Sequence, residues 1–179
     1  MKNETSYRWI VLAAFMLVAL ISQLLWLTFA PISSEVSKIF GVSAFHVSLL
    51  SLVWPLVFVI IAIPVGIFID KKGFKRSVAL GAVIMAIFSV IRIFSTFPNY
   101  NFIFLLISQT GCSISQAFIF GSITKLSISW FSEDEYGIAN GLATIGLFIG
   151  MMLALILTPM LFLSFGITGM LVVYAIISC

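Results

Sequence analysis

Long apolar runs separated by short polar breaks dominate the chain. Five runs are long enough to cross a bilayer as helices: 9–30, 45–69, 77–97, 102–130 and 137–165. A hydrocarbon core of about 30 Å requires about 20 residues of α-helix. The short alternating segments that are typical of a membrane β-barrel do not occur in the sequence. The pattern therefore predicts an all-α polytopic membrane protein.

A sixth apolar run begins near Ile167 and reaches Cys179. As α-helix, residues 167–179 would cover about 20 Å, which is less than a hydrocarbon core. We therefore expect one transmembrane domain over residues 1–179, with five complete helices and an incomplete sixth. The first run is longer than the apolar region of a signal peptide and lacks a small-residue cleavage site, so we expect it to be retained.

Composition agrees with a membrane protein. The chain is 62% hydrophobic and 8% charged, whereas about a quarter of the residues of a soluble domain are charged. A net charge of +3 is too small to indicate nucleic-acid binding. The two cysteines, Cys112 and Cys179, lie in apolar runs, so we expect neither a disulfide framework nor a metal site. No span carries a catalytic or cofactor motif, and we predict that the protein is not an enzyme.

Basic residues predict the orientation in the membrane. All but two of them fall on the same side as the N-terminus: Lys2, Arg8, Lys71, Lys72, Lys75, Arg76 and Lys125. Lys38 lies on the opposite side, and Arg92 lies within a span. Because cytoplasmic loops carry the excess of basic residues, we expect a cytoplasmic N-terminus in a multi-pass protein of the cell membrane, with lipid around it.

Polar side chains form a stripe on each of two predicted spans. The first stripe consists of Ser22, Gln23 and Trp26, and the second of Gln109, Cys112, Ser113 and Gln116. Polar groups in the membrane either line an aqueous cavity or bond neighbouring helices, and both readings stay open for any one of them. The paired stripes favour a pathway. Its candidate lining residues are Gln23, Trp26, Gln109, Ser113 and Gln116.

Other polar and small residues predict local contacts. We expect Arg92, near the outer end of the third span, to extend its side chain to the lipid headgroups. His46 is expected to make a capping or headgroup contact. Ser132 and Glu135 have the spacing of a capping box that begins the fifth span.

Small residues and prolines predict how the helices pack and bend. Gly146, Gly150, Ala154 and Thr158 recur every four residues and would let another helix approach closely. Kinks are expected at three prolines within spans, namely Pro55, Pro64 and Pro159.

Charge is concentrated in one turn, GIFIDKKGFKR (66–76). This turn holds five of the fifteen charged residues, the fifteen being nine Lys and Arg plus six Asp and Glu. The excess of basic residues in cytoplasmic loops would explain its lysines, but it would not explain Asp70 between two glycines. Its pattern resembles the loop signature of the major facilitator superfamily, G-x-x-x-D-[RK]-x-G-[RK]-[RK]. The matching positions are Gly66, Asp70, Lys71, Gly73, Lys75 and Arg76, while Phe74 departs where a basic residue is usual.

A second segment is similar to the same superfamily. Trp130-Phe131, followed by Glu135, Gly137 and Ala139, resembles W-F-x-x-x-E-R-G-x-A, with Tyr136 where Arg is common. The resemblance implies the N-terminal half of a bundle with two six-helix halves that transports a small solute by alternating access. It also implies that helices one and four line the cavity, and that Asp70 contacts the other half and helps to hold the outward-open state. That C-terminal half is absent from the sequence, so a second chain or a continuation would have to supply it.

A narrower resemblance covers most of the chain. LLWLTFAPISSEV (24–36), SLVWPLVFVIIAIPVGIFID (51–70), SQTGCSISQAFIFG (108–121) and KLSISWF (125–131) are similar to the feline leukaemia virus subgroup C receptor-related transporters. That family is associated with haem, choline and ethanolamine. The resemblance implies that Trp26 and Gln116 face a substrate cavity, where an indole suits a choline-like cation. The alternative is a truncated or non-transporting membrane scaffold, or a half-transporter that needs a partner.

Overall fold

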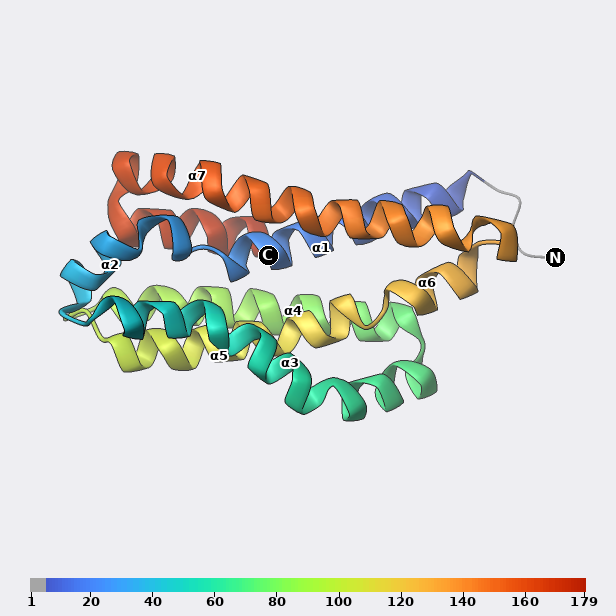
Figure 1. Cartoon of the computed structure of the whole chain (residues 1–179), viewed down its shortest axis with the longest axis horizontal. Helices are drawn as coiled ribbons and strands as arrows, with labels where there is room; N and C mark the ends of the chain where they lie inside the picture. Colours follow the sequence, from blue (N-terminus) through green and yellow to red (C-terminus); the bar gives the residue numbers. More distant parts are fainter. Residues whose placement is uncertain (1–5) are drawn as a thin grey trace.

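A computed structural model describes residues 6–179, which contain helices and no β-strand (Figure 1). Five of its helices are long and apolar enough to cross a membrane. The elements are α1 (Tyr7–Trp26), η1 (Ala30–Ile32), α2 (Ser33–Phe40), α3 (Ala44–Lys72), α4 (Phe74–Ile93), η2 (Phe94–Thr96), α5 (Phe102–Phe120), α6 (Ile123–Trp130), η3 (Glu133–Glu135) and α7 (Tyr136–Ser178). Lys2, which contributed to the predicted orientation, lies outside the described residues.

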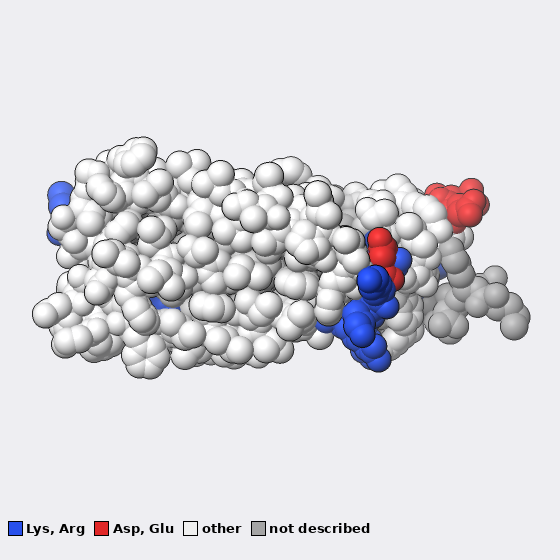
Figure 2. Space-filling view, turned by 90° about the horizontal axis from the view of Figure 1, so that it is seen from below, with Lys and Arg blue, Asp and Glu red and all other residues white. Residues whose placement is uncertain are grey.

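The long helices lie side by side along the length of a bundle (Figure 1). Helix α1 packs on α7, α5 packs on both α3 and α4, and α4 also contacts α7. The start of α1, the α3–α4 turn and the α6–α7 connection lie at one end. We call this the basic end, because it carries Lys71, Lys72, Lys75, Arg76 and Lys125. Figure 2 shows most of the coloured basic atoms of this face gathered there.

The first helix ends at Trp26, four residues before the predicted run does. Pro31 gives a physical reason, because it has no N–H to donate to the carbonyl of Leu27. The Leu27 carbonyl instead accepts from the N–H of Ala30 at 3.1 Å, and a 3₁₀ turn follows. Regular α-helical hydrogen bonding in the first run therefore ends at Trp26.

Helix α7 contains the fifth predicted run and the start of the sixth. At Gly166 the backbone has φ 65° and ψ −176°, which is a conformation that glycine adopts without steric cost. The chain reverses there, and residues 167–178 run back along the bundle (Figure 1). The break falls between the predicted runs 137–165 and 167–179.

The fourth predicted run, 102–130, is interrupted. Helix α5 ends at Phe120 and α6 begins at Ile123. At Gly121 an added Cβ would lie 2.7 Å from the Ala117 carbonyl oxygen and 2.9 Å from Cδ1 of Ile69. Gly121 therefore permits a close contact with α3 at the break.

The stripe of small residues on α7 faces α1, which confirms the predicted close approach. A Cβ at Gly150 would lie 2.2 Å from the carbonyl oxygen of Leu20, and one at Gly146 would lie 3.1 Å from Met16. Ala154 and Thr158 are fully buried. The backbones of α1 and α7 are therefore in contact at the stripe.

The predicted capping box is also present. Glu135 accepts from the backbone N–H of Ser132 at 3.2 Å and from its hydroxyl at 2.7 Å. Glu135 has a further partner that the sequence did not indicate. The guanidinium of Arg8 donates to both carboxylate oxygens, at 2.8 and 2.7 Å, and so ties the start of α1 to the α6–α7 connection. At the other end, His46 Nδ1 lies 2.8 Å from Ser43 Oγ, at the start of α3.

Candidate functional site

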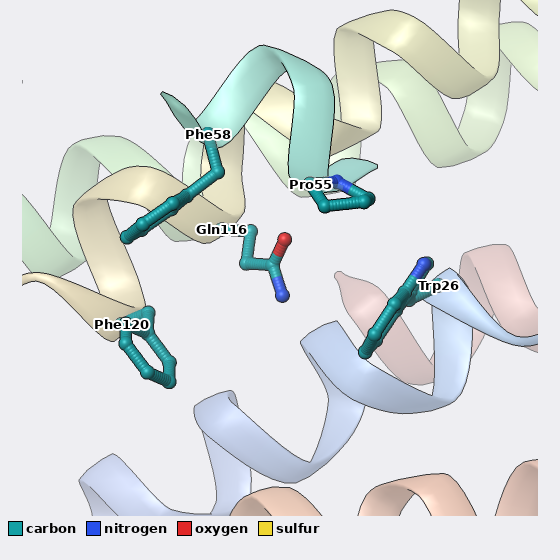
Figure 3. A pocket seen from close by; sticks show the side chains of 5 residues that line it. All are labelled: Trp26, Pro55, Phe58, Gln116 and Phe120. Atoms are coloured by element: carbon teal, nitrogen blue, oxygen red, sulfur yellow. The ribbon is translucent and has the colours of Figure 1, made fainter. Parts of the chain in front are cut away.

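Trp26 and Gln116, one from each predicted polar stripe, line the same cavity (Figure 3). The cavity has a volume of about 120 Å³, and its other lining residues are Pro55, Phe58 and Phe120. Trp26 is the last residue of α1, Pro55 and Phe58 lie in α3, and Gln116 and Phe120 lie near the end of α5. Figure 3 shows the four other side chains arranged around the Gln116 amide.

Pro55 explains how the Trp26 indole is held. In a regular helix the carbonyl of Ser51 would accept from the N–H of residue 55, but proline has no N–H. The freed carbonyl accepts instead from Nε1 of Trp26, at 2.8 Å. The single polar group of the indole is thus satisfied by α3, and the ring itself remains to line the cavity.

The cavity wall is aromatic and uncharged. The rings of Phe58 and Phe120 meet edge to face, with their centroids 5.4 Å apart. The five lining residues supply an indole, two phenyl rings, a pyrrolidine ring and one primary amide. Aromatic faces attract organic cations electrostatically, and an amide can either donate or accept a hydrogen bond. The wall is suited to a small organic solute with an apolar or cationic surface.

Gln109 lies behind the cavity and does not line it. It is fully buried. Its Nε2 lies 3.4 Å from the carbonyl oxygen of Leu25, 3.5 Å from that of Trp26 and 3.3 Å from that of Leu50. Gln109 therefore connects the end of α1 to α3 at the level of the Trp26–Ser51 hydrogen bond.

The prediction that Arg92 extends to the headgroups is wrong. Its side chain is fully buried, and Nη1 donates to Oε1 of Gln109 at 2.9 Å. The guanidinium carbon lies 5.3 Å from the centroid of the Phe29 ring. Nε and Nη2 have no hydrogen-bond partner within residues 6–179. Residue spacing along α4 carries no signal that Gln109 of α5 faces Arg92.

The other two pathway candidates lie outside the lining of this cavity. Ser113 is fully buried and donates to the Thr110 carbonyl at 2.6 Å. Gln23 is 1% exposed, and its Oε1 has no hydrogen-bond partner among the described residues. The structure thus brings Trp26 and Gln116 together, places Gln109 behind them, and leaves Gln23 and Ser113 elsewhere.

The charged turn lies at the basic end, away from the cavity residues. Asp70 accepts from Nζ of Lys125 at 2.9 Å, and the Asp70 side chain is 74% exposed. Gly73 has φ 80°, which explains the need for glycine at this reversal. Gly66, in contrast, has open space where a Cβ would be. The basic members of the motif are exposed: Lys71, Lys75 and Arg76.

Comparison with known proteins identifies the family. Residues 11–179 match the sequence profile described as Major Facilitator Superfamily. The chain is 32% identical over 163 residues to solute carrier family 49 member A3 of Xenopus tropicalis, covering 85% of this chain and 33% of the relative. It is 27% identical over 154 residues to the choline/ethanolamine transporter FLVCR1 of Felis catus, covering 86% and 27%. A third relative, the choline/ethanolamine transporter flvcr2b of Danio rerio, is 25% identical over 154 residues, covering 86% and 32%. The chain thus spans about a third of the length of these curated relatives.

Proposed function

The chain belongs to the major facilitator superfamily, and from that premise we propose that it forms one half of a transporter for a small organic solute. The observation that carries the proposal is the cavity at which Trp26 of α1 and Gln116 of α5 meet. Transporters of this superfamily hold the solute between two halves that rock against each other. The cavity on this half is then one wall of the site, and transport is secondary active or facilitative.

We propose a choline-like cation as the solute. A quaternary ammonium group cannot donate hydrogen bonds, and aromatic rings bind it through cation–π attraction worth about 0.5–2 kcal/mol per ring. Trp26 presents its ring while its N–H is occupied by Ser51, and Phe58 and Phe120 add two more rings. Two of the relatives are named choline/ethanolamine transporters, which supports the same class of solute.

The proposed transporter needs a C-terminal half and a defined orientation in the membrane. We propose that a C-terminal half, whether a continuation or a second chain, completes the site, and that lipid surrounds the bundle. The basic end faces the cytoplasm in this proposal, because basic residues accumulate on that side. Asp70, largely exposed at that end, is available to contact the other half.

Binding of labelled choline to the purified chain in nanodiscs tests the substrate. We expect Trp26→Ala to weaken binding by about 2- to 30-fold, because it removes a cation–π partner and one wall of the cavity. Trp9→Ala is the matched control, since Trp9 lies at the basic end and lines no part of this cavity. Equal choline affinity in Trp26→Ala and wild type would contradict the role given to the indole.

A half-transporter or membrane scaffold without transport of its own is the second candidate. The chain spans about a third of the length of its relatives. Uptake of labelled choline into proteoliposomes separates the candidates. Uptake by the chain alone, or by the chain with a partner half, contradicts a scaffold, and uptake only with the partner half assigns transport to the assembly of two halves.

A further inference from the structure

We propose that Arg92 is a positioning residue for the solute cavity, acting through Gln109 on the backbone that holds the Trp26 indole. The link to solute binding rests on the function proposed above for that cavity. The link to the indole rests on hydrogen bonds alone. Arg92 itself is not among the residues that line the cavity.

Arg92 lies in an unusual environment for a charged side chain. Within residues 6–179 the only ion pairs are Arg8–Glu135 and Lys125–Asp70, so no carboxylate of the described chain neutralises Arg92. Its hydrogen bonding is limited to Gln109, with the Phe29 ring alongside. A buried charge with so few partners is costly, and an apolar side chain of similar size would often serve stability as well or better. This cost points to a role other than packing.

Arg92 fixes the orientation of the Gln109 amide. A glutamine side chain can present either its oxygen or its NH₂ group in a given direction, whereas a guanidinium can only donate. Arg92 therefore selects the orientation in which Oε1 faces the guanidinium. In that orientation Nε2 must face the carbonyls of Leu25, Trp26 and Leu50.

The three carbonyls belong to the backbone segments that hold the Trp26 indole in place. The Leu25 and Trp26 carbonyls belong to the last turn of α1, where helix carbonyls lose their intrahelical donors. Leu50 precedes Ser51, whose carbonyl accepts the Trp26 indole N–H. The Gln109 amide thus lies between the two backbone segments that carry the donor and the acceptor of that bond. A change in the direction of this amide is transmitted to the indole.

The test follows the four indole N–H resonances of the ¹⁵N-labelled chain in nanodiscs, with choline as the probe. Trp26→Phe assigns the Trp26 resonance. We expect Arg92→Met to shift or broaden that resonance, leave those of Trp9 and Trp130 in place, and weaken choline binding about tenfold. Arg92→Lys keeps a donor for Gln109 and is expected to restore most of the affinity. Lys38→Met is the control for loss of one positive charge, because Lys38 makes none of the contacts described for this network.

Gln109→Glu tests the same link in a second way. A carboxylate still accepts from Arg92 but has no N–H for the three carbonyls, so the network is cut while the buried Arg92 keeps a partner. We expect the same displacement of the Trp26 resonance as in Arg92→Met. This variant tests the proposal even if Arg92→Met does not fold.

Three outcomes are distinguishable. Displacement of the Trp26 resonance together with weaker choline binding supports the proposal. An unchanged resonance in both Arg92→Met and Gln109→Glu overturns it. Displacement in a protein whose wild-type form binds no choline even with a partner half present supports the positioning of the indole and overturns the choline site instead.

Discussion

At the scale of single residues, the missing backbone N–H of Pro55 determines how the Trp26 indole is held. Its missing N–H frees the Ser51 carbonyl, and that carbonyl holds the Trp26 indole at 2.8 Å. The sequence predicted a kink at Pro55 and a polar stripe that includes Trp26. It could not connect the two, because hydropathy and helical spacing describe one helix at a time. The contact between Arg92 and Gln109 could not be predicted for the same reason, since the two residues lie on different helices and meet only after packing.

Pro55→Ala is expected to release the indole. Alanine restores a backbone N–H that competes with Trp26 for the Ser51 carbonyl, and it removes a helix-interior proline that costs about 3 kcal/mol relative to alanine. We expect faster hydrogen exchange at the Trp26 indole and several-fold weaker choline binding, both measured on the purified chain. Pro64→Ala is the matched control, because Pro64 lies in the same helix but does not line the cavity. Equal effects of the two substitutions would show that helix straightening, and not the freed carbonyl, matters.

At the scale of helices, the apolar runs identified the spans, and the small-residue stripe identified one close helix pair. The breaks within runs were harder to predict. Helix α1 stops at Trp26 because Pro31 cannot supply a donor, and the α5–α6 break lies at Gly121, where α3 comes close. The length of an apolar run reveals neither feature, because one is a single missing N–H and the other is a tertiary contact.

Gly150→Leu tests the contact between α1 and α7. A Cβ at position 150 would lie 2.2 Å from the Leu20 carbonyl oxygen, and this backbone cannot move without separating the helices. We expect a loss of about 1–3 kcal/mol of stability, the usual cost of overpacking, measured as a lower Tm in detergent. Gly141→Leu is the control, because a Cβ there meets nothing within 4 Å. A Tm equally lowered by both would assign the effect to glycine replacement in general.

At the scale of the whole molecule, the charged turn and the aromatic cavity lie at different places. The aromatic cavity contains no charged lining residue, and the Asp70–Lys125 pair lies at the basic end with its acidic member largely exposed. An exposed pair of this kind contributes about 0–1 kcal/mol to stability. The charged turn is therefore expected to contribute little to the fold of this chain and more to the contact proposed with a second half.

Asp70→Asn is expected to leave the Tm of the chain nearly unchanged and to alter conformational balance once both halves are present. The measurement is cysteine accessibility from the two membrane faces in the two-half protein, where we expect a shift away from the outward-open pattern. Lys125→Met separates the causes, because it breaks the ion pair but keeps the carboxylate. An accessibility pattern in Asp70→Asn identical to that of wild type would contradict a role for this loop in the balance.

The uncharged cavity has an electrical consequence. If the proposed choline-like cation is the solute, it would meet no countercharge among Trp26, Phe58, Phe120 and Gln116, so this wall would not cancel the charge that moves during transport. Moving one elementary charge across the bilayer exchanges about 2.3 kcal/mol per 100 mV of membrane potential. In the proposed transporter, a membrane potential that is negative inside would therefore draw a choline-like cation inward without any coupled ion.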